Sequence, residues 1–279
     1  MRVSKKNWKL FLCISLVLAL LAAMYYFFIS NKSYTVDKSD LAFYTCFYGS
    51  NDNIAFKIPP LPSTKFDCYY FTNNNDMFKK IESSGWIPIY DIDDKPVTTD
   101  IVASCMMGKE VKVSPDKNVI LNKYKYTCFF DSKVPKVSEE FIQNMIKKYF
   151  IDQDYALLLR EHQWVQPKIW KEYDESMTQE RYKKDSEHYK SYINGKLANG
   201  LSDTVSKHGT CYLLLRNMKH PQIAALDKAW ADNIKECGIQ DQISFFFVKQ
   251  EFDEYIHVFN EKPFADKDVI GPCGKPRCL

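Results

Sequence analysis

The sequence contains little glycine, and it lacks the motifs of several common enzyme classes. Only 9 of 279 residues are glycine, whereas 19 are phenylalanine and 18 are tyrosine. A chain this rich in aromatic side chains can bury a large core, which excludes global disorder. The sequence lacks the G-x-S-x-G motif of many hydrolases, the P-loop of nucleotide triphosphatases and the H-E-x-x-H motif of metalloproteases. Those classes therefore have no support.

Excess positive charge is lacking as well, once the N-terminus is set aside. The 38 basic and 35 acidic residues give a net charge of +3. Arg2, Lys5, Lys6 and Lys9 all precede the first acidic residue, so the rest of the chain is close to neutral. It has no basic stripe of the kind that nucleic-acid binding requires. We therefore expect no nucleic-acid partner.

Charge is missing altogether from residues 10–29, LFLCISLVLALLAAMYYFFI. A helix of this length spans about 30 Å, which matches the hydrocarbon core of a bilayer. The basic residues before it place the N-terminus in the cytoplasm by the positive-inside rule. We expect a single-pass type II membrane protein of the secretory pathway, located in the Golgi with its domain in the lumen. The alternative is a cleaved signal peptide, although its apolar region is normally only about 7 to 15 residues long.

These features divide the chain into five parts. We expect a cytoplasmic tail at 1–9, a transmembrane signal anchor at 10–29, a stem at 30–40, one folded domain at 41–255 and a C-terminal tail at 256–279.

The cysteines have no zinc-ligand spacing, because no C-x-x-C pair or Cys/His cluster occurs. Cys13 lies in the expected anchor, which leaves eight others. An even number in an oxidising compartment permits disulfide bonds, and Cys273 with Cys278 could close a small loop. Buried free thiols are an equally weighted alternative.

Strands and helices are expected to alternate along the domain. Apolar, β-prone runs predict strands at 41–48, 66–72, 87–92, 124–130 and 212–216. Helices are predicted at 138–150 with Ser138 as N-cap, at 167–193, and at 221–237 before Gly238. This alternation predicts an α/β fold with a largely parallel sheet flanked by helices.

Polar side chains stand at or near the ends of several predicted strands. Ligands of open α/β sheets bind beyond the carboxyl ends of the strands. The residues at these positions are Tyr44, Thr45, Thr72, Asn73 and Asp131. Lys109 and Lys112 are three residues apart, so one turn of helix would direct both ammonium groups at a single anion.

An ordered series of segments resembles a known family. The segments are FYTCFYGSND (43–52), FDCYYFTN (66–73), GW (85–86), KEVKVSP (109–115), CFFDSK (128–133), YLLLR (212–216) and QDQISFFFV (240–248). Together they resemble the glycosyltransferase-like domain of plant and bacterial proteins linked to mucilage and cell-wall polysaccharide, formerly a domain of unknown function. The resemblance covers roughly residues 42 to 250 and implies a nucleotide-sugar-binding fold of the GT-A type. It further implies that Tyr44 and Thr45 lie against the nucleoside, with Thr72 and Asn73 nearby.

The same resemblance implies roles for the charged residues. Lys109 and Lys112 would face the diphosphate and neutralise the leaving group. Asp131 would hold a divalent cation, Mn²⁺ or Mg²⁺, that bridges the diphosphate oxygens. Asp241 and Gln242 would line the sugar or acceptor pocket.

The chain departs from the family pattern at five positions. Lys109 stands where arginine is usual, Asp116 where histidine is usual, and Asn73 where aspartate is usual. Lys133 replaces a small or amide residue, and Gln240 replaces a basic one. A lysine loses the bidentate phosphate recognition of arginine. Lys133 would repel a metal or replace it as the cation on the diphosphate, so the departures bear most on metal dependence.

Simpler structural roles compete with these functions. Asp131 could cap a turn, and Asp241 could complement a helix N-terminus. Lys109 and Lys112 could form a solvated helix face. His208 precedes the strand at 212–216, and its position there makes it a candidate for contact with substrate.

The leading hypothesis is a type II membrane glycosyltransferase-like protein that transfers a hexose from a nucleotide sugar to a glycan or polysaccharide acceptor. A non-catalytic, membrane-anchored carbohydrate-binding or scaffold protein on the same fold is the second. A lumenal hydrolase is a weaker third, since no nucleophile constellation supports it.

Overall fold

The computed structural model describes residues 17–21, 24, 35–50, 52, 56–91 and 95–262. It divides into two compact units, Met1–Thr35 and Val36–Leu279. In the first unit, residues 17–21 and 24 are helical, and most of the expected anchor at 10–29 lies outside the described residues. None of the helices described is both long enough and apolar enough to span a membrane.

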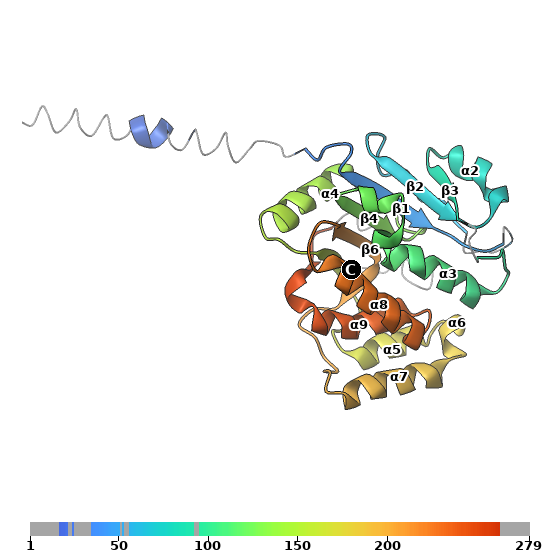
Figure 1. Cartoon of the computed structure of the whole chain (residues 1–279). Helices are drawn as coiled ribbons and strands as arrows, with labels where there is room; N and C mark the ends of the chain where they lie inside the picture. The colour runs from blue at the N-terminus through green and yellow to red at the C-terminus, as the bar shows by residue number, and fades with distance from the viewer. Residues whose placement is uncertain are drawn as a thin grey trace, which may run out of the picture. The chain divides into compact units, whose positions relative to one another are not determined.

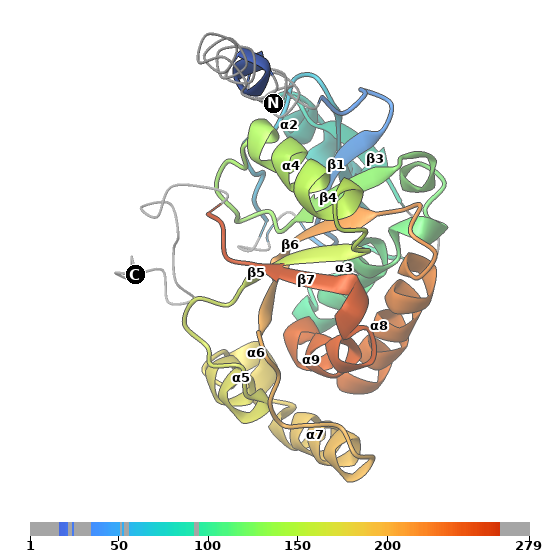
Figure 2. The same cartoon turned by 90° about the vertical axis from the view of Figure 1, so that its left-hand side faces the viewer.

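A seven-stranded sheet in the order β3-β2-β1-β4-β6-β5-β7 forms the centre of the second unit (Figure 1; β5 and β7 are labelled in Figure 2). The strands are β1 Leu41–Cys46, β2 Asp67–Thr72, β3 Ile87–Tyr90, β4 Tyr126–Phe130, β5 Leu157–Glu161, β6 Gly209–Asn217 and β7 Ile256–Phe259. β3, β2, β1 and β4 are parallel, and so are β5 and β7. β6 pairs antiparallel with both β4 and β5. The predicted largely parallel sheet is confirmed.

Helices flank both faces of this sheet. They are α2 Phe78–Glu82, α3 Ile101–Val113, α4 Glu139–Met145, α5 Ile169–Ser176, α6 Glu180–Lys183, α7 Ser186–Ala198, α8 Ile223–Cys237 and α9 Asp241–Glu251. A π-helical turn, Ile146–Ile151, continues α4. Figure 2 shows α4 on one side of the strands and α3, α8 and α9 on the other.

The central strands are buried on both faces because their residues are apolar and aromatic almost without interruption. On β1, Tyr44 packs in the core with Val111 of α3 and Trp230 of α8. On the opposite face the ring of Tyr126 stacks on Phe150, with centroids 5.7 Å apart. The aromatic runs that predicted these strands therefore contribute side chains to two cores, one on each face of the sheet.

Local signals placed two helix ends correctly, the start of α4 and the end of α8. The Ser138 hydroxyl accepts a hydrogen bond from the Phe141 amide, as an N-cap does. Gly238 ends α8 with φ of 101°, a conformation that side chains other than glycine rarely adopt. The stretch at 167–193 forms three helices, α5, α6 and most of α7, instead of one. β7 lies beyond residue 255, so the sheet continues into the segment we expected to be a tail.

The six cysteines among the described residues are free thiols: Cys46, Cys68, Cys105, Cys128, Cys211 and Cys237. Disulfide bonds between these residues are therefore not supported, and the free-thiol alternative describes them. Cys13, Cys273 and Cys278 lie outside the described residues.

Candidate functional site

Two lysines and two aspartates converge near the carboxyl end of β4. Lys109 Nζ lies 2.6 Å and Lys112 Nζ 2.7 Å from the same oxygen, Oδ2 of Asp241. Lys112 Nζ is also 3.4 Å from Oδ1 of Asp131, the residue that follows β4. We refer to Lys109, Lys112, Asp131 and Asp241 as the Lys–Asp cluster. The two lysines do share one anion, and that anion is a side chain of the protein.

Local contacts position three members of this cluster, Lys112, Asp131 and Asp241. The Tyr44 hydroxyl, which projects from β1, donates to the carbonyl of Lys112 at 3.1 Å. The Asp131 amide donates to the carbonyl of Tyr212 at 2.9 Å, which extends the pairing of β4 with β6. Asp241 is the first residue of α9, where the helix dipole favours a negative charge. The predicted complement to a helix N-terminus is thus one part of its role.

Burial makes these charges strongly dependent on one another. The side chains of Lys112 and Asp241 are 6% and 8% exposed, whereas that of Asp131 is 33% exposed. Burial alone would lower the pKa of Lys112, but Asp131 and Asp241 raise it above its ordinary value. Burial would likewise raise the pKa of Asp241, but Lys109 and Lys112 hold it below its ordinary value. Asp131 is therefore the member of the cluster most open to solvent.

A second buried group, which was not predicted, holds the two residues next to Asp241 in sequence. Its centre is Glu172 of α5, which is 2% exposed. Glu172 Oε1 accepts hydrogen bonds from Gln240 Nε2 at 3.2 Å and Gln242 Nε2 at 2.9 Å. The two residues that flank Asp241 are thereby held by one carboxylate, which fixes the start of α9.

Glu172 also binds two stacked histidines. His208 Nε2 is 2.8 Å from Glu172 Oε2, and His162 Nε2 is 3.8 Å from the same oxygen. The imidazole rings are nearly parallel, with centroids 5.4 Å apart. The Val165 amide donates to His162 Nδ1, so a neutral His162 carries its proton on Nε2, facing the carboxylate. Glu172 therefore joins His208 and Gln242, two of the predicted site residues.

The four residues expected near the nucleoside are buried. Tyr44 accepts a hydrogen bond from Arg216 Nη1 at 3.3 Å, and burial raises its pKa above the ordinary value. Asn73 accepts from the Gly49 amide and donates to the carbonyls of residues 95 and 96. Asn73 therefore ties the loop after β1 to the loop after β3. Thr72 accepts from the Asn74 amide, and Thr45 Oγ1 has no hydrogen-bond partner within the described residues.

Thiols near the cluster are not poised as nucleophiles. Burial raises the pKa of Cys46 to about 12, although Lys112 lies nearby. Burial also raises the pKa of Cys211 well above its ordinary value. Both are protonated thiols at neutral pH, which gives no support to a cysteine hydrolase.

The donor set around Asp131 does not fit a divalent cation. Among residues 35–262 as described, no group of three or more His, Cys, Asp or Glu side chains could hold a metal ion. The second carboxylate of the cluster, Asp241, is already bound by two ammonium groups. Lys112 also shares Oδ1 of Asp131, so a metal there would face a lysine. The expectation that Asp131 is a metal ligand stays a prediction, and the contact with Lys112 does not favour it.

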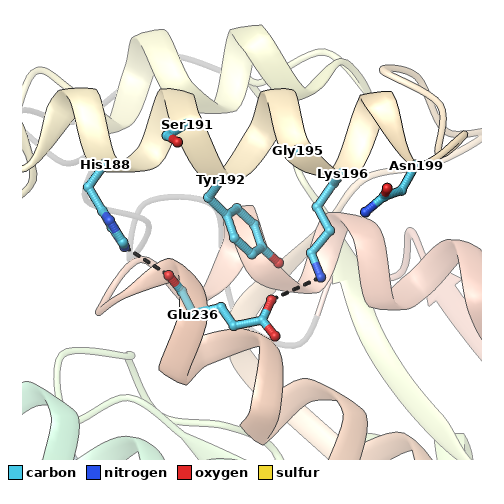
Figure 3. Close-up of a pocket in the computed structure, with 7 residues that line it drawn as sticks. All are labelled: His188, Ser191, Tyr192, Gly195, Lys196, Asn199 and Glu236. Atoms are coloured by element: carbon cyan, nitrogen blue, oxygen red, sulfur yellow. Dashed lines mark hydrogen bonds and ion pairs between the residues drawn. The ribbon is translucent and has the colours of Figure 1, made fainter.

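Two surface pockets lie away from the Lys–Asp cluster. One, of about 260 Å³, runs between α7 and α8 and is lined by residues including His188, Lys196 and Glu236 (Figure 3). Another, of about 410 Å³, is lined by residues that include Asp67 and Tyr124, near the starts of β2 and β4. The linings of both omit the predicted site residues.

Comparison with known proteins finds no matching family model and no matching curated protein. Among solved structures, the chain is similar to mouse xyloside xylosyltransferase 1 in its apo form. The TM-score is 0.47 at 10% identity, over 79% of this chain and 85% of that one. It is also similar to the mannosyltransferase Ktr4p of S. cerevisiae, with a TM-score of 0.37 at 11% identity, over 80% and 69% of the two chains. Both neighbours are glycosyltransferases by name, at a likeness too low to assign a function to this chain.

Proposed function

We propose that this protein is a glycosyltransferase-like protein of the GT-A type that binds a nucleotide sugar at the Lys–Asp cluster. It transfers the hexose to a glycan or polysaccharide acceptor, as a type II membrane protein with its domain in the Golgi lumen. The observation that carries the proposal is the convergence of Lys109 and Lys112 beside Asp131 at the carboxyl end of a central strand. Ligands of open α/β sheets bind at this edge.

The reaction requires what such a cluster supplies. The bond from the sugar C1 to the diphosphate oxygen breaks, and its electron pair stays on the diphosphate. The acceptor hydroxyl oxygen forms the new bond to C1, and its proton passes to water. Negative charge therefore grows on the leaving group, and preorganised ammonium groups lower the barrier to its departure.

Asp241, Gln242 and His208 are proposed to face the sugar and acceptor. Because Lys109 and Lys112 hold the pKa of Asp241 low, its carboxylate stays ionised and is a weak base. It would accept hydrogen bonds from sugar hydroxyls instead of removing a proton. Gln242 lies next to it at the start of α9, and Glu172 restrains both Gln242 and His208.

One observation favours the second candidate, a non-catalytic sugar-binding or scaffold protein. Asp241 contacts both lysines and offsets one of their two positive charges, and Asp131 offsets the other. Without net positive charge, the Lys–Asp cluster binds a diphosphate less tightly than two unpaired lysines would. Binding of a sugar without cleavage of its donor would fit this candidate.

Thermal unfolding of the full-length protein with UDP- and GDP-hexoses tests the proposal. A ligand at a hundred times its dissociation constant stabilises the folded state by about 2.7 kcal/mol. We expect this stabilisation in the wild type and in Lys117→Gln, whose lysine is exposed and lies just beyond α3. It should be lost in Lys112→Ala.

Release of the nucleoside diphosphate, followed by mass spectrometry, then separates the two candidates. Release with transfer or hydrolysis of the hexose identifies an enzyme, whereas binding alone identifies a sugar-binding protein. No stabilisation by any UDP- or GDP-hexose would contradict the proposal.

A further inference from the structure

We propose that the Lys112 ammonium takes the place of a divalent cation in this site, so that the protein binds its nucleotide sugar without metal. This inference rests on the proposed function and specifies how its site is charged. It starts from the disagreement between the expected metal ligand, Asp131, and the groups that surround it.

Lys112 occupies the position of a bridging cation. Its Nζ lies 2.7 Å from Asp241 Oδ2 and 3.4 Å from Asp131 Oδ1, and so joins two carboxylates from different elements. Divalent cations in phosphate-binding sites are commonly held by one or two carboxylates together with the phosphate oxygens. Here the two carboxylates are present, and an ammonium group stands between them.

The ammonium group retains the capacity to bind phosphate. Lysine has three N–H donors and no acceptor. Two contacts lead to Asp131 and Asp241, which leaves one N–H for a phosphate oxygen. The Phe129 ring, 5.0 Å from Nζ, packs beneath the ammonium group and helps to hold it in place.

Further cations are disfavoured at this position by the charges already there. Lys109 contacts the same oxygen of Asp241 as Lys112 does, so both ammonium groups meet at one point. Lys133 follows Asp131 by two residues and is exposed. A metal on Asp131 would therefore stand beside the ammonium group of Lys112, and like charges at close range repel.

Calorimetric titration of the full-length protein with UDP and with GDP tests this inference. Each titration is run with EDTA and then with Mn²⁺. We expect the dissociation constants in the two conditions to agree within about twofold. A tenfold difference would correspond to about 1.4 kcal/mol of binding free energy. Electron paramagnetic resonance of Mn²⁺ should show no binding to the protein alone.

Variants then test whether Lys112 is the cation concerned. Lys112→Gln should weaken nucleotide binding by at least about tenfold, as loss of a charged hydrogen-bond donor does. Lys112→Arg keeps the charge and should retain binding, and Lys117→Gln serves as the matched control. Circular dichroism establishes that each variant is folded. If Lys112→Gln does not fold, the EDTA comparison in the wild type and in Lys112→Arg decides the outcome.

The possible failures are distinguishable. If Mn²⁺ tightens nucleotide binding by about tenfold or more in the wild type, the inference is overturned while the proposed function stands. Unchanged nucleotide affinity in folded Lys112→Gln would also overturn it. If the folded wild type binds neither nucleotide in either condition, the proposed function fails and the inference fails with it.

Discussion

Replacing Asp241 by asparagine removes the carboxylate on which two buried ammonium groups converge. The asparagine side chain has nearly the same shape as aspartate, so the change tests charge more than packing. Lys109 and Lys112 would lose their shared partner, and Lys112 would keep only Asp131, at 3.4 Å. Removing one partner of a buried ion pair typically costs about 3–5 kcal/mol, because the remaining charge is left uncompensated.

We expect a loss near the lower end of that range, about 3 kcal/mol. Lys109 is 16% exposed, which gives it some solvation, and Asp131 still offsets part of the charge. For a chain of this size, each kcal/mol lowers the melting temperature by about 2–4 °C, so the midpoint should fall by about 6–12 °C. Urea unfolding followed by circular dichroism measures the free energy directly.

Asp232→Asn is the matched control, because Asp232 forms ion pairs with Lys228 and Lys235 on the exposed side of α8. Its melting temperature should equal that of the wild type. The double variant Lys112→Met, Asp241→Asn should be less unstable than the sum of its two single changes predicts. A wild-type melting temperature in Asp241→Asn, or strictly additive effects in the cycle, would refute the view that the ammonium groups depend on this carboxylate.

Two further predictions concern the same region. Because the pKa of Asp241 is held below its ordinary value of 3.8, its contribution to stability is complete above that pH and is lost as the pH falls through the lower, folded-state pKa. The gap in melting temperature between wild type and Asp241→Asn should therefore narrow in acid below pH 3.8, and a constant gap would contradict the assignment. Glu172→Gln should lower the free energy of unfolding by about 2 kcal/mol, since it weakens hydrogen bonds to a buried charged group. Glu187→Gln, at an exposed position of α7, is its control, and equal unfolding curves for the two variants would count against a special role for Glu172.

Much of the sheet could be predicted because the residue types of its strands indicate that these strands are buried. β1, β2 and β4 consist largely of aromatic and β-branched residues that are buried in the structure. β5 and β7 were not predicted, since LLLRE and IHVF are short runs that lack a clear alternation. Their pairing depends on β6 and on each other, which no local pattern records.

The candidate site was predicted only in part, for a similar reason. The spacing of Lys109 and Lys112 correctly indicated that both ammonium groups would meet one anion. The identity of that anion could not be read from spacing, because Asp241 lies 132 residues away from Lys109. Glu172 lies in a charge-rich stretch that resembles a solvated helix, and it is buried because its own helix packs against α9.

The reversed direction of β6 has a consequence for how this protein could diversify. β5 leaves the sheet and β6 enters it at the same edge, and the His162 amide donates to the carbonyl of His208 at 2.7 Å. The segment 163–207, which contains α5, α6 and α7, therefore begins and ends at one backbone hydrogen bond, between His162 and His208. The segment can change in length without shifting strand register, provided that Glu172 keeps its hydrogen bonds to Gln240 and Gln242.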